Sequence, residues 1–209
     1  MKKTVTAVFS LLLTITFVAL FFAPKSHGQV PTNNEQSVLT RDISVGKADA
    51  TMSALPQRVN YELAYPGILP DNPLYFLKMI RDKIVKVLIT DTLKKAEFNL
   101  LNAEKRMYAA QFLVDKKKFD LAITTASKSN NYFDEAIFEM KNIQSRTSET
   151  LPLLQKMKTV ISKNEEVLSD LIKATNGTTK SAFIEEEKRA KKLENSVDKL
   201  ILEKSSKKK

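Results

Sequence analysis

The sequence lacks cysteine and tryptophan altogether, and its 209 residues include a single histidine, His27, and four glycines. The absence of cysteine excludes disulfide bonds and the lipid-modified cysteine of a bacterial lipoprotein. Imidazole and thiolate are the usual ligands of zinc, copper and haem iron. They are also the side chains best suited to proton transfer or nucleophilic attack near neutral pH. The scarcity of both groups therefore argues against most metal sites and most covalent catalysis.

Residues 1–28 have the pattern of an export signal. Two lysines precede an uncharged, largely apolar stretch at residues 4–24, and small residues then come before a cleavage point at Gln29. The stretch is also close to the roughly 20 residues that cross a bilayer, so an uncleaved N-terminal anchor is the alternative. In both cases the rest of the chain lies outside the cytoplasm, because the positive charge precedes the apolar segment. Cleavage also removes His27, and no Ser-His-Asp or Cys-His site can then form.

The remaining chemistry open to the chain is that of carboxylates. The glycines are too scattered for a phosphate-binding loop, and the acidic residues lack the loop spacing of calcium sites. We therefore predict no catalytic residue, no metal site and no cofactor. The enzymatic alternative is a carboxylate-based hydrolase of a cell-wall polymer that uses Glu185, Glu186 or Glu187. A simpler interpretation of these three residues is the solvated start of a helix, where negative charge favours the helix dipole.

The charge of the chain is strongly positive, with 34 basic and 24 acidic residues and a formal net charge of +10. Removal of three of the 34 basic residues with the signal leaves 31, and the net charge becomes +7. Such a chain is attracted to anionic membrane lipids, anionic surface polymers or acidic envelope proteins. The lysines are spread over the whole chain, so we expect this attraction to be weak. Nucleic acid is not an expected partner, since the chain is exported and has no recognition motif.

The chain after the signal divides into a linker and a helical region. Residues 29–62 are rich in Ser, Thr, Asn and Gln and show no sustained period, which predicts a flexible, disordered linker. Residues 63–209 show apolar residues at spacings of three and four, which predicts an all-α fold. We expect an elongated antiparallel helical bundle of about five helices, with a C-terminal helical hairpin and basic tail at 150–209.

The predicted helices are separated by polar breaks and caps. The first runs from Pro73 to about Ile89, and the second from a cap at Thr90 or Asp91 to a turn at Lys116–Lys118. The third runs from Phe119 to about Arg146. The fourth runs from a cap at Thr150 to Asn176-Gly177, and the fifth from about Lys180 to the tail. The apolar stripe of the first helix consists of Leu77, Ile80, Ile84, Val87 and Leu88. The stripe of the second consists of Leu93, Ala96, Leu100, Ala103, Met107, Ala110 and Val114. The third carries Phe119, Ala122, Ala126, Phe133, Ile137 and Met140, the fourth Leu154, Met157, Ile161, Leu168 and Leu171, and the fifth Phe183, Ala190, Leu193, Val197 and Leu200.

The stretch YPGILPDNPLYFLK, Tyr65 to Lys78, differs from its surroundings in its density of proline and aromatic residues. Pro66-Gly67 predicts a turn, and Pro73 suits the first position of a helix that Asn72 caps. This interpretation makes the stretch the beginning of a helix, covered by apolar residues, and it predicts that Tyr65, Leu69 and Tyr75 are largely buried. The alternative is the edge of a peptide-binding groove.

The same stretch, with the helical sequence that follows it, resembles a bacterial family of exported proteins classified only as a domain of unknown function. The resemblance covers Leu63 to Met140, and beyond Thr147 we expect none. It implies an exported helical protein, and it brings no activity, ligand or catalytic residue. The positions that match the motif of this family are Tyr65, Pro66, Gly67, Leu69, Pro70, Pro73, Leu74, Tyr75, Leu77, Lys78, Arg81 and Asp82.

These observations favour a non-enzymatic structural or interaction module at the bacterial cell envelope. Its expected partner is an envelope protein or an anionic surface polymer, held along a helical face. The chain would be either secreted or tethered to the membrane by its N-terminal apolar segment.

Overall fold

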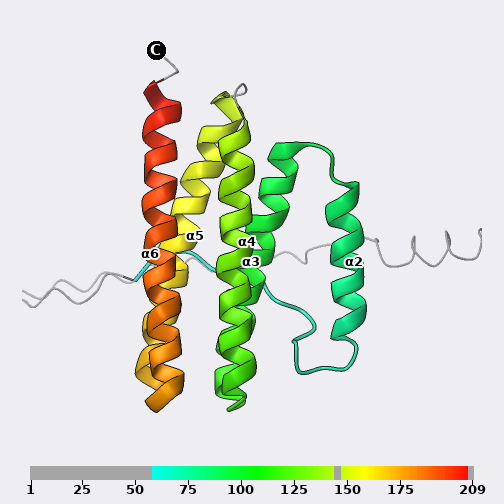
Figure 1. Ribbon diagram of the computed structural model, residues 1–209, viewed down its shortest axis with the longest axis vertical. Coiled ribbons are helices and arrows are strands. Elements are labelled where there is room, and N and C mark those ends of the chain that lie inside the picture. Colours follow the sequence, from blue (N-terminus) through cyan, green and yellow to red (C-terminus); the bar gives the residue numbers. More distant parts are fainter. Residues whose placement is uncertain (1–57, 144–146, 207–209) are drawn as a thin grey trace, which may run out of the picture. The chain divides into compact units, whose positions relative to one another are not determined.

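The computed structural model describes residues 58–143 and 147–206, and these residues form five helices joined by short connections (Figure 1). The all-α prediction and the predicted number of helices are therefore confirmed for this part of the chain. The predicted signal or anchor, most of the predicted linker and the last three lysines lie outside the described residues. The helices are α2 (Tyr75–Leu88), α3 (Thr92–Asp115), α4 (Phe119–Asn142), α5 (Thr147–Ala174) and α6 (Gly177–Ser206).

Helices α3 to α6 form two antiparallel hairpins, α3 with α4 and α5 with α6, that pack side by side (Figure 1). Within the first hairpin, the Ser129 hydroxyl donates a hydrogen bond of 2.7 Å to the carbonyl of Ala103. Between the hairpins, α4 lies beside α6, and Asn130 donates to the carbonyl of Glu186 at 3.0 Å. Neighbours within a hairpin are antiparallel as predicted, whereas α4 and α6 run in the same direction, as do α3 and α5.

The predicted apolar stripes of α3, α5 and α6 are buried at every position, and they form one continuous core with the stripe of α4. The exception on α4 is Phe119, which is 37% exposed because it is the first residue of the helix and extends past the core. The alanines of α3 at positions 96, 103 and 110 are fully buried. Their small side chains permit the close approach of α3 and α4, and the hydrogen bond at Ala103 is possible only at that distance.

The helix ends follow local backbone chemistry. Asp91 precedes α3 and accepts a hydrogen bond from the amide of Lys94 at 3.0 Å, as expected of an N-cap. The chain turns between α3 and α4 with Lys117 in the left-handed region, and between α5 and α6 with Gly177 there. The predicted cap at Thr150 is wrong, because α5 already begins at Thr147. Pro152 is therefore inside the helix, where it leaves the carbonyl of residue 148 without its usual helical donor.

Candidate functional site

The turn before α2 is held by a lysine from the helix itself. The Lys78 ammonium donates hydrogen bonds to the carbonyls of Pro66, at 2.5 Å, and Ile68, at 3.4 Å. Pro66 is buried, and Gly67 adopts a φ of +67°, which a side chain would strain. Burial lowers the pKa of Lys78. The predicted turn is confirmed, and Lys78 of the motif is the residue that closes it.

The three predicted burials in this segment have different outcomes. Tyr75 is buried as predicted, at 7% exposure, and Leu69 is half-buried. The prediction for Tyr65 is wrong, because its side chain is 70% exposed. The Tyr65 ring packs edge-on against Tyr108 and Phe112 of α3, with 6.4 Å between ring centroids in both cases. One edge of the ring therefore contacts α3 while the rest faces solvent.

A second anchor holds this segment against the turn between α3 and α4. Both Lys116 and Lys118 contact the Asp71 carboxylate at 3.0 Å. The hydrogen bonds from Lys118 and Lys116 hold the pKa of Asp71 below its usual value. Asn72 accepts a hydrogen bond from the amide of Leu74 at 2.9 Å, but the prediction that it caps a helix starting at Pro73 is wrong, because residues 71–74 form a turn and α2 begins at Tyr75. Two further motif positions are Pro70, which is half-buried, and Pro73, which is exposed.

The inward side of α2 meets the bundle through alternating cations and aromatic rings. The Arg106 guanidinium carbon of α3 lies 5.0 Å from the ring centroid of Tyr75 and 5.7 Å from that of Tyr132 on α4. Lys78 lies 5.7 Å from the Tyr75 ring, and Lys86 lies 5.8 Å from the Tyr132 ring. We call these five residues the cation–aromatic ladder. It joins α2, α3 and α4 by contacts that are mainly electrostatic.

Beside the ladder lies a cavity of about 410 Å³ between α2 and its neighbours. Asp82 of the motif lies in the wall of this cavity and is 7% exposed. One of its carboxylate oxygens accepts a hydrogen bond from Arg81 at 2.7 Å, and the other is buried without a hydrogen-bond partner. Lys86 pairs with Glu135 across the cavity at 2.6 Å. Cations outnumber acids in the lining, which consists of Met79, Asp82, Lys83, Lys86, Phe98, Arg106, Lys128, Asn131, Tyr132 and Glu135. The side of α2 that faces the bundle is therefore largely polar.

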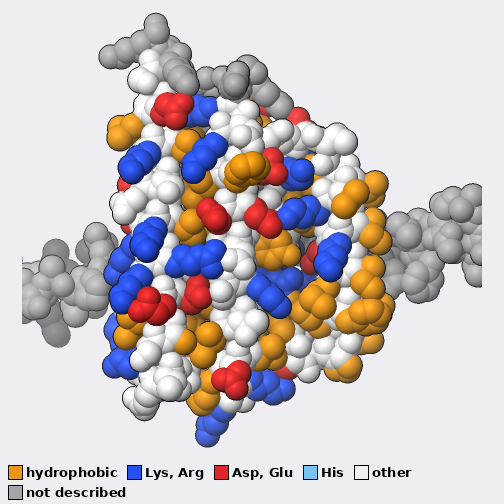
Figure 2. All heavy atoms as spheres, viewed as in Figure 1, with side chains coloured by type: hydrophobic (Ala, Val, Ile, Leu, Met, Phe, Trp, Pro, Cys, Tyr) orange, Lys and Arg blue, Asp and Glu red, His pale blue; other side chains and the backbone are white. Residues whose placement is uncertain are grey.

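The opposite side of α2 is apolar and exposed, and this overturns the expectation that the stripe of the first helix packs into the core. Its exposed fractions run from 45% at Ile80 to 82% at Val87. At 100° per residue, six apolar residues fall within an arc of about 120° on the outer side of the helix. We call them the outer apolar face: Phe76, Leu77, Ile80, Ile84, Val87 and Leu88. Figure 2 shows hydrophobic side chains gathered over α2, at the right of the view.

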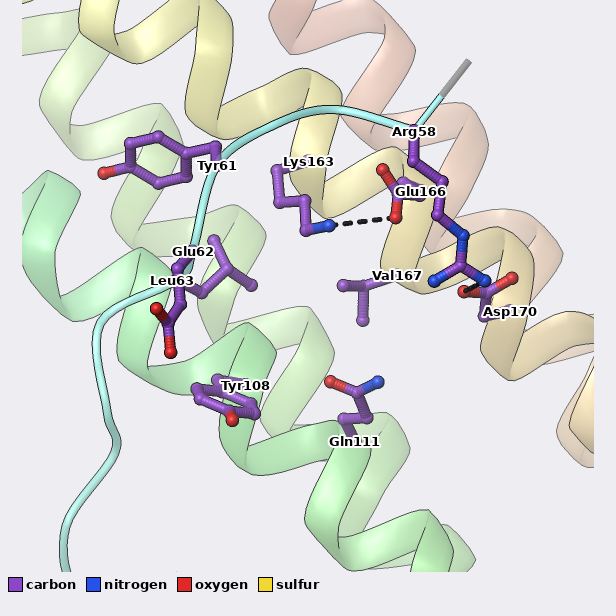
Figure 3. Close-up of a pocket in the computed structure, with 10 residues that line it drawn as sticks. All are labelled: Arg58, Tyr61, Glu62, Leu63, Tyr108, Gln111, Lys163, Glu166, Val167 and Asp170. Atoms are coloured by element: carbon purple, nitrogen blue, oxygen red, sulfur yellow. Dashed lines mark hydrogen bonds and ion pairs between the residues drawn. The ribbon is translucent and has the colours of Figure 1, made fainter. Parts of the chain in front are cut away.

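A second recess lies where residues 58–63 cross α3 and α5 in extended conformation (Figure 3). The Val59 amide donates to Glu166 at 2.7 Å, and Lys163 donates to the same carboxylate at 2.9 Å. Burial alone would raise the pKa of Glu166, but these two hydrogen bonds and the charges of Lys163 and Arg58 together lower it. Arg58 points toward Asp170, 3.9 Å away. The recess has a volume of about 210 Å³, and four of its five charged side chains form two pairs, Arg58 with Asp170 and Lys163 with Glu166.

The family model that matches this chain describes a domain of unknown function, DUF5667, and it covers residues 67–204. The chain belongs to the DUF5667 family. The match includes α5 and α6, so the predicted end of the resemblance at Met140 is wrong. Neither the curated proteins nor the solved structures gave a match.

The three glutamates considered for hydrolysis lie on the α6 of this DUF5667 domain, and each contacts a neighbouring side chain. Glu185 pairs with Lys188 at 2.8 Å, and Glu187 pairs with Lys191 at 3.3 Å. Glu186 accepts a hydrogen bond of 2.8 Å from Asn130 of α4. Within residues 58–143 and 147–206, no group of acidic residues is arranged to hold a metal ion. In the same ranges, no helix combines the length and hydrophobicity needed to cross a membrane.

The sequence interpretation missed Arg106 and Tyr132, which complete the ladder. Arg106 is 4% exposed and directly precedes Met107 of the buried α3 stripe. A cation beside a buried apolar stripe in the sequence could have indicated this contact, because a buried charge requires a compensating partner. The identity of that partner was not available from spacing, since Tyr75 and Tyr132 belong to different helices.

Proposed function

We propose that this DUF5667 chain is a non-enzymatic interaction module at the bacterial cell envelope, and that the outer apolar face of α2 is its docking surface. The observation that carries the proposal is the orientation of α2, which turns polar residues inward and six neighbouring apolar residues outward. Single exposed apolar residues are ordinary on protein surfaces, whereas a contiguous apolar face is typical of an interaction site.

The contacts on the inner side of α2 support this proposal, because they hold the helix in that orientation. Lys78 bonds the preceding turn, Lys86 pairs with Glu135 of α4, and Tyr75 packs against Arg106 of α3. Rotation of α2 to bury its apolar residues would break all three contacts. The helix is therefore held so that its outer apolar face is available to a partner.

Export is the second part of the proposal, and it rests on the basic start and uncharged stretch of residues 1–28. The net charge of +7 after removal of that segment suits a compartment whose surfaces carry anionic lipids and polymers. For the alternative hydrolase, no observation in the described residues brings two of the glutamates at 185–187 together in a recess.

A photo-crosslinking amino acid placed at Val87 tests the docking surface in intact cells. Val87 is 82% exposed on the outer apolar face, and Phe138, 62% exposed on α4, is the matched control position. We expect adducts, with protein or with lipid, from position 87 and not from position 138. Equal yields at both positions, or none, would contradict the docking surface. Recovery of the wild-type chain from the cytoplasmic fraction alone would contradict export.

A further inference from the structure

We infer that the partner of the outer apolar face is a membrane surface rich in anionic lipid, on which α2 lies flat. This inference rests on the proposed docking surface and names its occupant. An interfacial helix buries an apolar face at the boundary between head groups and acyl chains, and its cations lie at the level of the head groups. The sequence YFLKMIRDKIVKVL of α2 meets both conditions.

The cations of α2 are placed where such a surface needs them. On the helical projection, Lys83 falls about 20° beyond one border of the outer apolar face, and Arg81 falls about 20° beyond the other. Both are exposed, with 61% of the Arg81 side chain accessible. A helix resting on its apolar face would bring both cations to the head-group level. Each basic residue near an anionic leaflet contributes roughly 1 kcal/mol of attraction.

The acidic residues of α2 do not oppose this attraction at the surface. The helix contains one acid, Asp82, which is buried on the inner side and engaged by Arg81. Each flank of the outer apolar face therefore presents an exposed cation and no exposed acid. This charge is complementary to anionic lipid and gives a reason for preference over neutral lipid.

A second copy of the chain is a poorer occupant for the same reason. Two α2 helices packed face to face would place the Arg81 and Lys83 flanks of one copy against the same flanks of the other. Every arrangement of two such faces brings like charges together, because α2 has no exposed acid on either flank. The face is thus suited to a negatively charged apolar boundary and not to itself.

The chain has no tryptophan, so one introduced residue provides an unambiguous reporter. We would prepare the full chain with Phe76→Trp, on the outer apolar face, and with Phe138→Trp as the matched control on α4. Residues 4–24 can insert into vesicles by themselves, so the difference between the two reporters is the readout. With phosphatidylglycerol vesicles we expect a blue shift and quenching by brominated lipid for Phe76→Trp only. The shift should be smaller with phosphatidylcholine and weaker in high salt.

The exposed pair Ile80→Ser and Ile84→Ser, added to Phe76→Trp, tests the apolar part of the inference. Both positions are exposed, so we expect an unchanged circular dichroism spectrum and loss of the blue shift. A shift that survives the two substitutions would overturn the inference, as would an equal shift with neutral and anionic vesicles. A blue shift that depends on protein concentration without vesicles would indicate a second copy and would also overturn it.

If no vesicle shifts the reporter but position 87 crosslinks to a protein in cells, the lipid inference fails and the docking surface stands. If neither occurs, both fail.

Discussion

The guanidinium carbon of Arg106 lies 5.0 Å from the centre of the Tyr75 ring, and this contact joins the first turn of α2 to the middle of α3. Arg106 is 4% exposed and Tyr75 is 7% exposed, so the interaction is shielded from solvent. Cation–aromatic contacts gain strength when they are desolvated, up to about 2 kcal/mol. The orientation of α2, and with it the outer apolar face, depends on this pair and on its neighbours in the ladder.

Replacing Tyr75 separates the role of its ring from that of its hydroxyl. The hydroxyl is buried without a hydrogen-bond partner, so Tyr75→Phe should leave the free energy of unfolding unchanged or raise it by up to about 1 kcal/mol. Tyr75→Leu removes the aromatic face and should speed the hydrogen exchange of α2 amides. The measurements are urea unfolding and hydrogen exchange. Exchange in α2 that is equally fast in both variants would contradict the role of the ring.

Charge removal at Arg106 tests the same contact from α3. Arg106→Met keeps an unbranched apolar stem and abolishes the cation, so we expect a loss of about 1–2 kcal/mol and faster exchange in α2. Arg189→Met on α6 is a control at a half-buried arginine that bonds Asn131 instead of an aromatic ring. An unchanged α2 exchange rate in Arg106→Met would contradict the prediction.

The outward orientation of the α2 stripe can be tested by two identical substitutions. Leu77 of α2 is 54% exposed, and Leu100 of α3 is 1% exposed. Leu100→Ala should lower the free energy of unfolding by about 3–5 kcal/mol, because it leaves a cavity in the core. Leu77→Ala should change it by less than about 1 kcal/mol, because more than half of the residue is already exposed to solvent. Chemical denaturation of both variants provides the comparison, and similar losses would show that Leu77 packs against the bundle.

The free energy of unfolding should fall as the pH rises, because Glu165 of α5 loses a proton. Burial, and to a smaller extent the nearby charge of Glu194, raise the pKa of Glu165 from 4.5 to about 7. The folded chain therefore holds this proton more tightly than the unfolded chain does. The resulting stability is fully present below about pH 4.5 and is lost as the pH rises through about 7.

Glu165→Gln should remove this dependence. The full shift corresponds to roughly 3 kcal/mol, which partial solvent exposure reduces to about 1–2 kcal/mol. We therefore expect the variant to be more stable than the wild type by that amount at about pH 8 and nearly equal to it at about pH 4. Denaturation at both pH values is the measurement, and Glu97→Gln, at an exposed position of α3, is the control. A gain that does not vary with pH would contradict the assignment.

Glu104 of α3 anchors the segment that precedes α2. Its carboxylate accepts hydrogen bonds from the Tyr61 hydroxyl at 3.1 Å and the Ala64 amide at 3.2 Å, and it pairs with Lys156 at 3.5 Å. Burial, the Glu104 charge and this hydrogen bond together raise the pKa of Tyr61 to about 12. Glu104→Gln should lower that pKa and cost about 1–3 kcal/mol of stability.

The ultraviolet absorbance of phenolate, followed during alkaline titration, measures this effect, and Tyr61→Phe identifies the contribution of Tyr61. The wild-type titration should contain an ionisation at about pH 12 that the Tyr61→Phe variant lacks, and this ionisation belongs to Tyr61. A titration curve that is identical in the wild type and Glu104→Gln would contradict the contact.

Much of the fold could be predicted because helical periodicity is a local property. The α3 stripe from Leu93 to Val114 is buried at all seven predicted positions, and the turn at Lys116–Lys118 lies where the basic run placed it. The same logic failed for α2. Its stripe is as regular as that of α3, but a period of three and four residues identifies an apolar side without stating what that side faces.

The amino-acid sequence by itself determined the helices, the Asp91 cap of α3, the buried stripes of α3 to α6 and the chemistry that the chain lacks. It did so because caps and periodicity act within a few residues along the chain. Only the tertiary structure decided the direction of the α2 stripe, the exposure of Tyr65 and the meeting of Tyr75, Arg106 and Tyr132. These depend on contacts between residues far apart in sequence, and α2 makes such contacts through its polar side.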